Sequence, residues 1–211
     1  MKIISTNIAK PRTFIWLGKE ETTGIFKKPT NEPIYLTKND VLNDEVSNRL
    51  NHGGYYKACY IFSSEQYPYW KSLYPTLDWG WGMFGENLTV SDFDERKVVL
   101  GDIYKVGEAL VQVSQYREPC YKFGHKFGSQ KVLKQFVKHG FGGTYLSILE
   151  EGNVTINDKF TLVERPKNSL SVAELFELVF AKEKDQDLLK IAIKSKAIPL
   201  KERMLLSEYL K

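Results

Sequence analysis

Apolar and polar residues alternate over several short stretches of this chain, and a period of two is typical of β-strands. The clearest stretches are residues 98–106 and 109–115, in which Val111 and Val113 alternate with polar neighbours. Gly107 and Glu108 separate them, which predicts a two-residue hairpin turn with glycine first. Further strands are predicted over residues 2–9, 57–62, 145–149 and 154–164, the last two as a pair joined through residues 151–153.

Two helices are predicted to interrupt these strands. One begins near Ser64 and carries Tyr67 and Trp70 at helical spacing. The other has Ser129 as its N-cap and ends at Gly140, because serine caps a helix start and glycine suits the position after its last turn.

The pattern after residue 166 is helical only. Ser171 and Glu174 form a capping box at the start of a helix that runs to residue 180. Asp185 is suited to cap a second helix, and Pro199 to stand in the first turn of a third. We therefore expect a small C-terminal three-helix appendage over residues 168–211, which serves as a packing cap or a partner-binding module.

Residues 1–167 are predicted to form a mainly β domain with helices. Many short strands at close spacing, with hairpins between them, favour a closed or partly open β-barrel over a doubly wound sheet. Antiparallel neighbours should dominate, because hairpins join antiparallel strands.

Composition narrows the class of protein. Of 211 residues, 42% are hydrophobic and 27% charged, with two cysteines and a net charge of +4. Two cysteines are too few for a secreted disulfide scaffold, and no apolar run is long enough for a signal peptide or a membrane span. We expect a cytoplasmic protein with reduced thiols and no membrane partner. Charges of mixed sign argue against nucleic-acid binding, whereas the mild positive excess favours small anionic ligands.

The first candidate site is the segment that ends the strand 109–115. Pro119 cannot continue a ladder, so the chain leaves the sheet there and presents Cys120 at a strand end. Arg117 precedes the thiol by three residues, and if it turns toward Cys120 it would favour the thiolate. A thiolate serves as a nucleophile or as a soft metal ligand. The alternative is a buried, inert cysteine.

The second candidate is His52-Gly53-Gly54, followed by Lys57. Paired glycines permit close approach of the backbone to a ligand. His52 could donate a hydrogen bond, bind a metal or cap the turn, and Lys57 could contact an anion or be solvated.

The third candidate lies in the glycine-rich segment 80–88. Its letters match G-x-G-x-x-G, but no strand precedes it and no helix follows, which excludes a dinucleotide site. The turn of Gly85, Glu86 and Asn87 could present backbone N–H groups and an amide to a polar ligand. Alternatively, the aromatic residues of this loop simply fill the core.

Taken in order, these segments resemble one known family, the MOSC domain of molybdenum-cofactor sulfurases and amidoxime-reducing proteins. The three-helix tail resembles the YiiM branch of that family. The resemblance covers the chain to about residue 165, and these residues carry it: His52-Gly53-Gly54 with Lys57-Ala58, Gly85-Glu86-Asn87-Leu88, Gly101-Asp102, Val113-Ser114-Gln115, Arg117, Pro119-Cys120 and Glu151-Gly152.

The resemblance implies a β-barrel that binds the molybdenum–molybdopterin cofactor, with the Cys120 thiolate as the metal ligand and catalytic residue. It implies reduction of N-hydroxylated compounds, such as hydroxylaminopurines, to amines. Arg117, Lys57, His52, Gly53, Gly54, Gly85, Glu86 and Asn87 are the expected cofactor-binding residues. No cysteine set for an iron–sulfur cluster is present, so electrons should come from a separate reductase. The oligomeric state stays open, with a homodimer among the candidates.

Ser147 departs from the family pattern, because the family often has an arginine at this position. If that arginine helps to hold an anion, the chain could instead be a non-catalytic carrier of the cofactor or of a sulfur species. A third hypothesis is a cofactor-free thiol protein, with Cys120 as the nucleophile and His52 or His125 as the base.

Overall fold

The computed structural model describes residues 1–47 and 52–211. The strands are β1 (Lys2–Ile8), β2 (Arg12–Trp16), β3 (Lys19–Thr23), β4 (Lys28–Thr30), β5 (Ile34–Leu36), β6 (Cys59–Ser63), β7 (Leu88–Ser91), β8 (Ile103–Val106), β9 (Ala109–Tyr116), β10 (Thr144–Glu150), β11 (Gly152–Val154) and β12 (Thr161–Glu164). The helices are η1 (Tyr55–Lys57), η2 (Ser64–Gln66), α2 (Tyr67–Leu73), α3 (Tyr121–Lys126), α4 (Lys131–His139), α5 (Val172–Phe180), α6 (Gln186–Ala192) and α7 (Leu200–Ser207).

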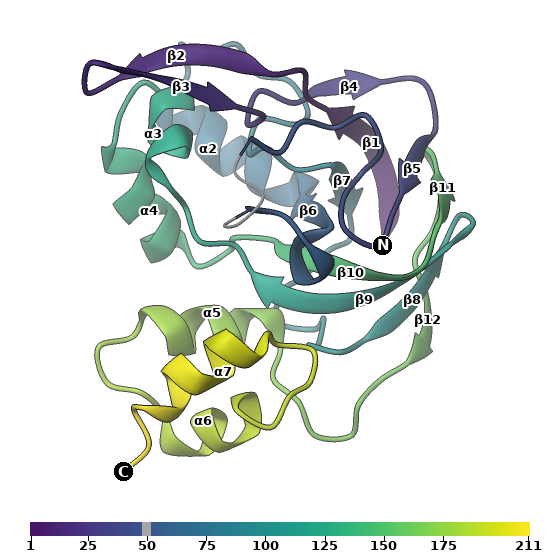
Figure 1. Ribbon diagram of the computed structural model, residues 1–211, viewed down its shortest axis with the longest axis vertical. Coiled ribbons are helices and arrows are strands. Elements are labelled where there is room, and N and C mark those ends of the chain that lie inside the picture. The colour runs from purple at the N-terminus through teal and green to yellow at the C-terminus, as the bar shows by residue number, and fades with distance from the viewer. Residues whose placement is uncertain (48–51) are drawn as a thin grey trace.

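Eight strands form one curved sheet in the order β12-β8-β9-β10-β6-β7-β1-β4 (Figure 1). The sheet curls into a partly open barrel, so the predicted mainly β, barrel-type fold is confirmed. Antiparallel pairing dominates as expected. Among the described strands, β6 and β7 alone pair in parallel, and η2 and α2 connect them. A parallel neighbour needs such a crossover because a tight turn cannot join the two strand ends.

Aromatic residues fill the space between the curved sheet and the internal helices. Phe62 of β6 stacks on Phe84 with 4.0 Å between ring centroids, and Trp70 of α2 and Phe136 of α4 pack beside them. Trp70, Phe84 and Phe136 have no exposed surface. Phe84 thus fills the core, as one of the two interpretations of segment 80–88 expects.

The predicted hairpin over β8 and β9 is confirmed, since Val106 pairs directly with Ala109. The strand is shorter than predicted, however. Asp102 accepts a hydrogen bond from the backbone N–H of Val99 through its carboxylate and donates its own N–H to the Val99 carbonyl. This turn interrupts the extended strand, although Gly101 and Asp102 still bond to the backbone of Val113, and β8 begins only at Ile103.

The predicted pairing of residues 145–149 with 154–164 is wrong. β10 instead pairs with β6 on one side and β9 on the other. β11 leaves the main sheet to pair with β5, and β12 returns to pair with β8. The chain bends at Gly152, where a Cβ atom would lie 2.6 Å from the Glu108 carbonyl carbon.

The three C-terminal helices form as predicted. Ser171 and Glu174 make the expected capping box at α5, and Asp185 caps α6. The helices lie together beside one end of β9 (Figure 1). Helix α5 packs against this strand, where Tyr116 contacts the rings of Phe176 and Phe180. In the part of the chain that the structure describes, no helix has the length and apolar character needed to cross a membrane.

Candidate functional site

A cavity opens where the end of β9 meets the long loop after β5. Its lining residues are Thr23, Gly24, Ile25, Lys27, Asp44, Glu45, Val46, Ser47, His52, Lys57, Ala58, Tyr60, Gly85, Asn87, Arg117, Glu118, Cys120, Lys122 and Tyr145.

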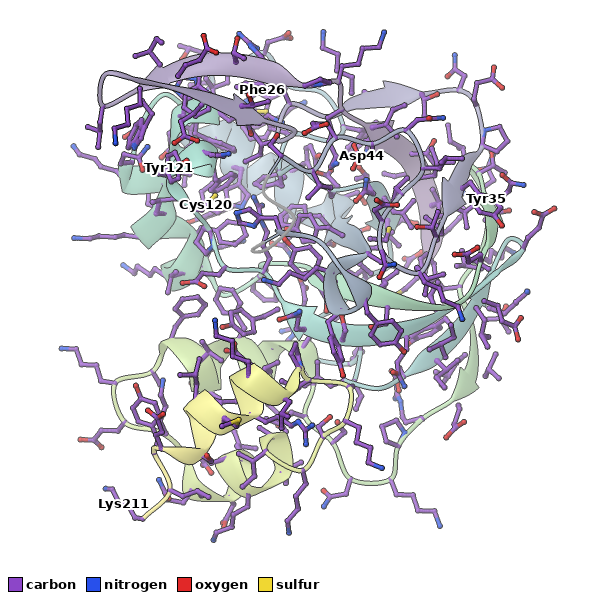
Figure 2. The ribbon with its side chains drawn as sticks, viewed as in Figure 1. Phe26, Tyr35, Asp44, Cys120, Tyr121 and Lys211 are labelled. Carbon is purple, nitrogen blue, oxygen red and sulfur yellow. The ribbon has the colours of Figure 1, made fainter. Side chains whose placement is uncertain are left out.

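Cys120 stands in the wall of this cavity with its side chain partly exposed. β9 ends at Tyr116, and Pro119 turns the chain away from the sheet, so that Cys120 becomes the residue before α3. Its carbonyl accepts the backbone N–H of Phe123 at 2.9 Å, which fixes the start of the helix. Figure 2 shows Cys120 beside Tyr121, with Asp44 on the loop after β5. The thiol is therefore not sealed among aliphatic side chains.

Arg117 is buried behind the thiol in a cage of aromatic rings. Its guanidinium carbon lies 4.9 Å from the Tyr60 ring centroid and 4.8 Å from that of Phe123. One amino group donates to the Phe84 carbonyl. Burial opposes the charged form, but the nearby Tyr60, Tyr145 and Cys120 outweigh it and raise the pKa of Arg117. The cavity thus contains a permanent positive charge that interacts electrostatically with Cys120.

Other cations surround the same space. Lys122 donates to the Thr22 carbonyl at 2.6 Å and lines the cavity, and Lys57 reaches it from η1. The pKa of His52 is affected by these positive charges. Burial, followed by the charges of Lys57, Arg117 and Lys122, lowers the pKa of His52 to about 4. His52 is consequently neutral at pH 7, and the cavity favours anions.

Asn87 also lines the cavity, but its amide is used within the protein. Its oxygen accepts from the Tyr60 backbone N–H at 3.2 Å, and its nitrogen donates to Asp44 at 2.9 Å. Asp44 forms a buried ion pair with Lys27 as well. This part of the wall is therefore a hydrogen-bonded polar network. Gly85, beside Asn87 in the chain, occupies a turn with a positive φ of 78°.

Three of the predicted binding residues do not line the cavity. Glu86 is fully buried and accepts hydrogen bonds from the backbone of Gly82 and Phe84, both at 3.0 Å, and from two hydroxyl groups. The N–H groups of Gly82 and Phe84 thus point at Glu86. Those of Gly85 and Asn87 donate to the carbonyl groups of Gly82 and Tyr60. Gly53 and Gly54 precede η1, where Gly54 has a φ of 87° and starts the turn that positions Lys57.

The two remaining sequence candidates also lie outside the lining. His125 stacks on Phe14 with 4.1 Å between ring centroids. Ser147 is buried in β10, and its hydroxyl has no hydrogen-bond partner in the described part of the chain. The residue that replaces the family arginine therefore does not contact the cavity itself.

Sequence reasoning missed several residues of the wall, chiefly Tyr60, Lys122, Tyr145 and the pair of Lys27 with Asp44. Tyr145 is brought to Cys120 by the pairing of β10 with β6 and β9. Lys122 follows Cys120 by two residues, and this proximity was the one signal that could have identified it. The other contacts depend on a loop fold without a local sequence signature.

The donor set suits a metal that arrives with ligands of its own. Among the described residues, no three His, Cys, Asp or Glu side chains are grouped so that they could hold a metal ion. Cys120 offers one soft sulfur, and the cations around it suit an anionic group. These residues fit a metal-bearing anionic cofactor and do not fit a bare metal ion.

Comparison with known proteins agrees with this fold. The MOSC domain model matches residues 48–161. The uncharacterized protein YflK of Bacillus subtilis (strain 168) is 36% identical over 172 residues, covering 81% of this chain and 76% of YflK. The crystal structure of YiiM from Geobacillus stearothermophilus superposes with a TM-score of 0.83 at 31% identity, covering 100% of this chain and 99% of that one.

A third relative is a protein named reductase from Gibberella moniliformis (strain M3125 / FGSC 7600). It is 32% identical over 176 residues, which cover 82% of this chain but only 31% of the reductase. The chain thus spans less than a third of that protein.

Proposed function

Since this chain belongs to the MOSC domain family, we propose that it binds the molybdenum–molybdopterin cofactor in the cavity at Cys120 and reduces N-hydroxylated compounds to amines. A separate reductase protein would supply the electrons. The single observation that carries the proposal is a partly exposed thiol in a cavity surrounded by buried cations.

The residues of the cavity wall would have separate roles in binding the cofactor. Cys120 would provide a soft sulfur ligand, which suits a metal already bound by dithiolene sulfur. Arg117, Lys57 and Lys122 would neutralise the anionic end of the cofactor, and the aromatic cage keeps the Arg117 guanidinium in place. When bound, the cofactor would supply the two-electron change and accept the oxygen atom that the substrate loses.

Metal content tests this proposal directly. Protein from a host that makes the cofactor should contain molybdenum, and Cys120→Ala should lose it. Cys59→Ala is the matched control, because Cys59 is fully buried in β6 and outside the cavity lining. Equal molybdenum in wild type and Cys120→Ala would refute ligation by this thiol.

A carrier of the cofactor, without turnover, is the second candidate. Ser147 favours it, because the resemblance to the family implies an arginine at this position, whereas the chain has a buried hydroxyl without a partner among the described residues. The two functions differ in one assay, the reduction of a hydroxylaminopurine by molybdenum-loaded protein with an artificial electron donor. If the loaded wild type reduces the substrate and Cys120→Ala does not, the reductase function is supported. If the loaded wild type does not reduce the substrate, the carrier function is supported instead.

A further inference from the structure

Tyr145 is the one tyrosine of the cavity wall whose hydroxyl, among the described residues, has no hydrogen-bond partner. Tyr60 donates to the Gly142 carbonyl at 2.7 Å. Outside the lining, Tyr116 donates to Glu202 at 2.8 Å, and Tyr67 donates to Glu86. Tyr145 is only partly buried, and its hydroxyl, unlike that of Tyr60, is therefore left available to a ligand in the cavity.

The ring of Tyr145 is nevertheless held firmly. Its backbone pairs with Tyr60 across β10 and β6, and the two ring centroids lie 5.2 Å apart. The Lys57 ammonium group lies 5.8 Å from the Tyr145 centroid, within range of a cation–π contact. A ring fixed by these neighbours holds its hydroxyl in one place, which is the property of a preorganised ligand contact.

The surroundings of this hydroxyl group identify the chemistry of its ligand. Tyr145 lies within electrostatic range of both Arg117 and Cys120, and all three residues line the same cavity. Lys57 and Lys122 add positive charge to that wall. An acceptor oxygen that carries negative charge is therefore the group that this corner of the cavity favours.

We propose that the Tyr145 hydroxyl donates a hydrogen bond to an oxygen atom of an oxyanion ligand held between Cys120 and Arg117. This inference deepens the proposed function and rests on it only in taking Cys120 as the residue that faces the ligand. The hydroxyl stays a donor throughout the neutral range, because burial raises the pKa of Tyr145 further than the Arg117 charge lowers it.

Two measurements on the full chain without cofactor test the inference. Titration calorimetry with molybdate, used as the oxyanion probe, should give a dissociation constant about fivefold larger for Tyr145→Phe than for wild type, as expected for one hydrogen bond. Tyr55→Phe is the matched control, because Tyr55 lies in η1 outside the lining, and its affinity should equal that of wild type.

Thermal unfolding gives the second readout. Tyr145→Phe should keep the melting temperature of wild type, since no hydrogen bond within the described protein is lost. Tyr60→Phe loses its bond to Gly142 and should melt about 3 °C lower. A comparable drop for Tyr145→Phe, or molybdate affinity equal to that of wild type, would overturn the inference.

The proposed function is decided separately, by the molybdenum content of protein from a cofactor-making host. If wild type retains the cofactor but Tyr145→Phe binds molybdate as tightly as wild type does, only the role of Tyr145 is refuted. Wild type that binds molybdate but never retains the cofactor would remove the redox function and leave an oxyanion site. Wild type that does not bind molybdate at all would overturn the inference.

Discussion

Glu95 allows a quantitative prediction about pH, because its carboxyl group is buried with only part of its hydrogen-bonding capacity used. The side chain is 1% exposed, Oε1 accepts the backbone N–H of Gly143 at 3.2 Å, and Oε2 has no partner in the described structure. Burial is the main cause that raises the pKa of Glu95 from 4.5 to about 7. The neutral acid is therefore the form that the fold prefers.

The sign of the effect follows from proton linkage. Between pH 4.5 and 7 the folded state binds more protons at this residue than the unfolded state does, so stability falls as pH rises. The rise of the Glu95 pKa from 4.5 to about 7, at 1.36 kcal/mol per pKa unit, corresponds to about 3 kcal/mol of unfolding free energy, present below pH 4.5 and lost above pH 7.

Glu95→Gln removes the titration and keeps an oxygen that can accept from Gly143. Urea unfolding at pH 5, 6, 7 and 8 should show wild type losing about 3 kcal/mol relative to this variant as pH rises. Glu177→Gln is the control, because Glu177 is exposed on α5, and its difference from wild type should stay constant. A constant difference for Glu95→Gln as well would refute the reasoning.

Three further changes have defined outcomes. Gly143→Ala should destabilise the protein by about 3 kcal/mol or more in urea unfolding, because its Cβ would lie 2.3 Å from the Ile61 carbonyl oxygen. Gly128 has a similar positive φ but lies in open space, so the control Gly128→Ala should reduce stability by only about 1 kcal/mol. Tyr116→Phe loses the hydrogen bond to Glu202 and should cost about 1 kcal/mol by the same assay, whereas an unchanged stability would show that this link between β9 and α7 contributes nothing. Burial lowers the pKa of Lys126 to about 7, so wild type should gain about 2–3 kcal/mol over Lys126→Met between pH 7 and pH 9, and a flat difference over this interval would contradict the burial of that amine.

The elements predicted correctly are those in which the local sequence pattern favours the same structure that the tertiary fold requires. The β8–β9 hairpin has a glycine turn between alternating strands, and α5 has a complete capping box. The β2–β3 hairpin was missed because its strands are mostly exposed and carry charged residues at most positions of β3. α3 was missed because it has only six residues and begins directly after Pro119-Cys120.

The site was predicted in part for a similar reason. Cys120, Arg117, His52 and Lys57 are recognisable from motifs and do converge on one cavity. Glu86 belongs to the same motif, yet its carboxylate organises the turn internally. A one-dimensional pattern cannot separate a residue that touches a ligand from one that shapes the loop beside it. Tyr145 was not predicted as a site residue, because only strand pairing brings it to the cavity that contains Cys120.

The first strand joins the sheet through partners that come much later in the chain. Lys2 pairs with Ser91, and the backbone of Met1 and Ile3 also accepts hydrogen bonds from Phe160 and Asn157. Strand β1 can therefore complete its hydrogen bonds only after the chain has been made to about residue 160. Pairings this distant in sequence slow folding to milliseconds or longer, so the newly made N-terminal half should depend on protection from aggregation.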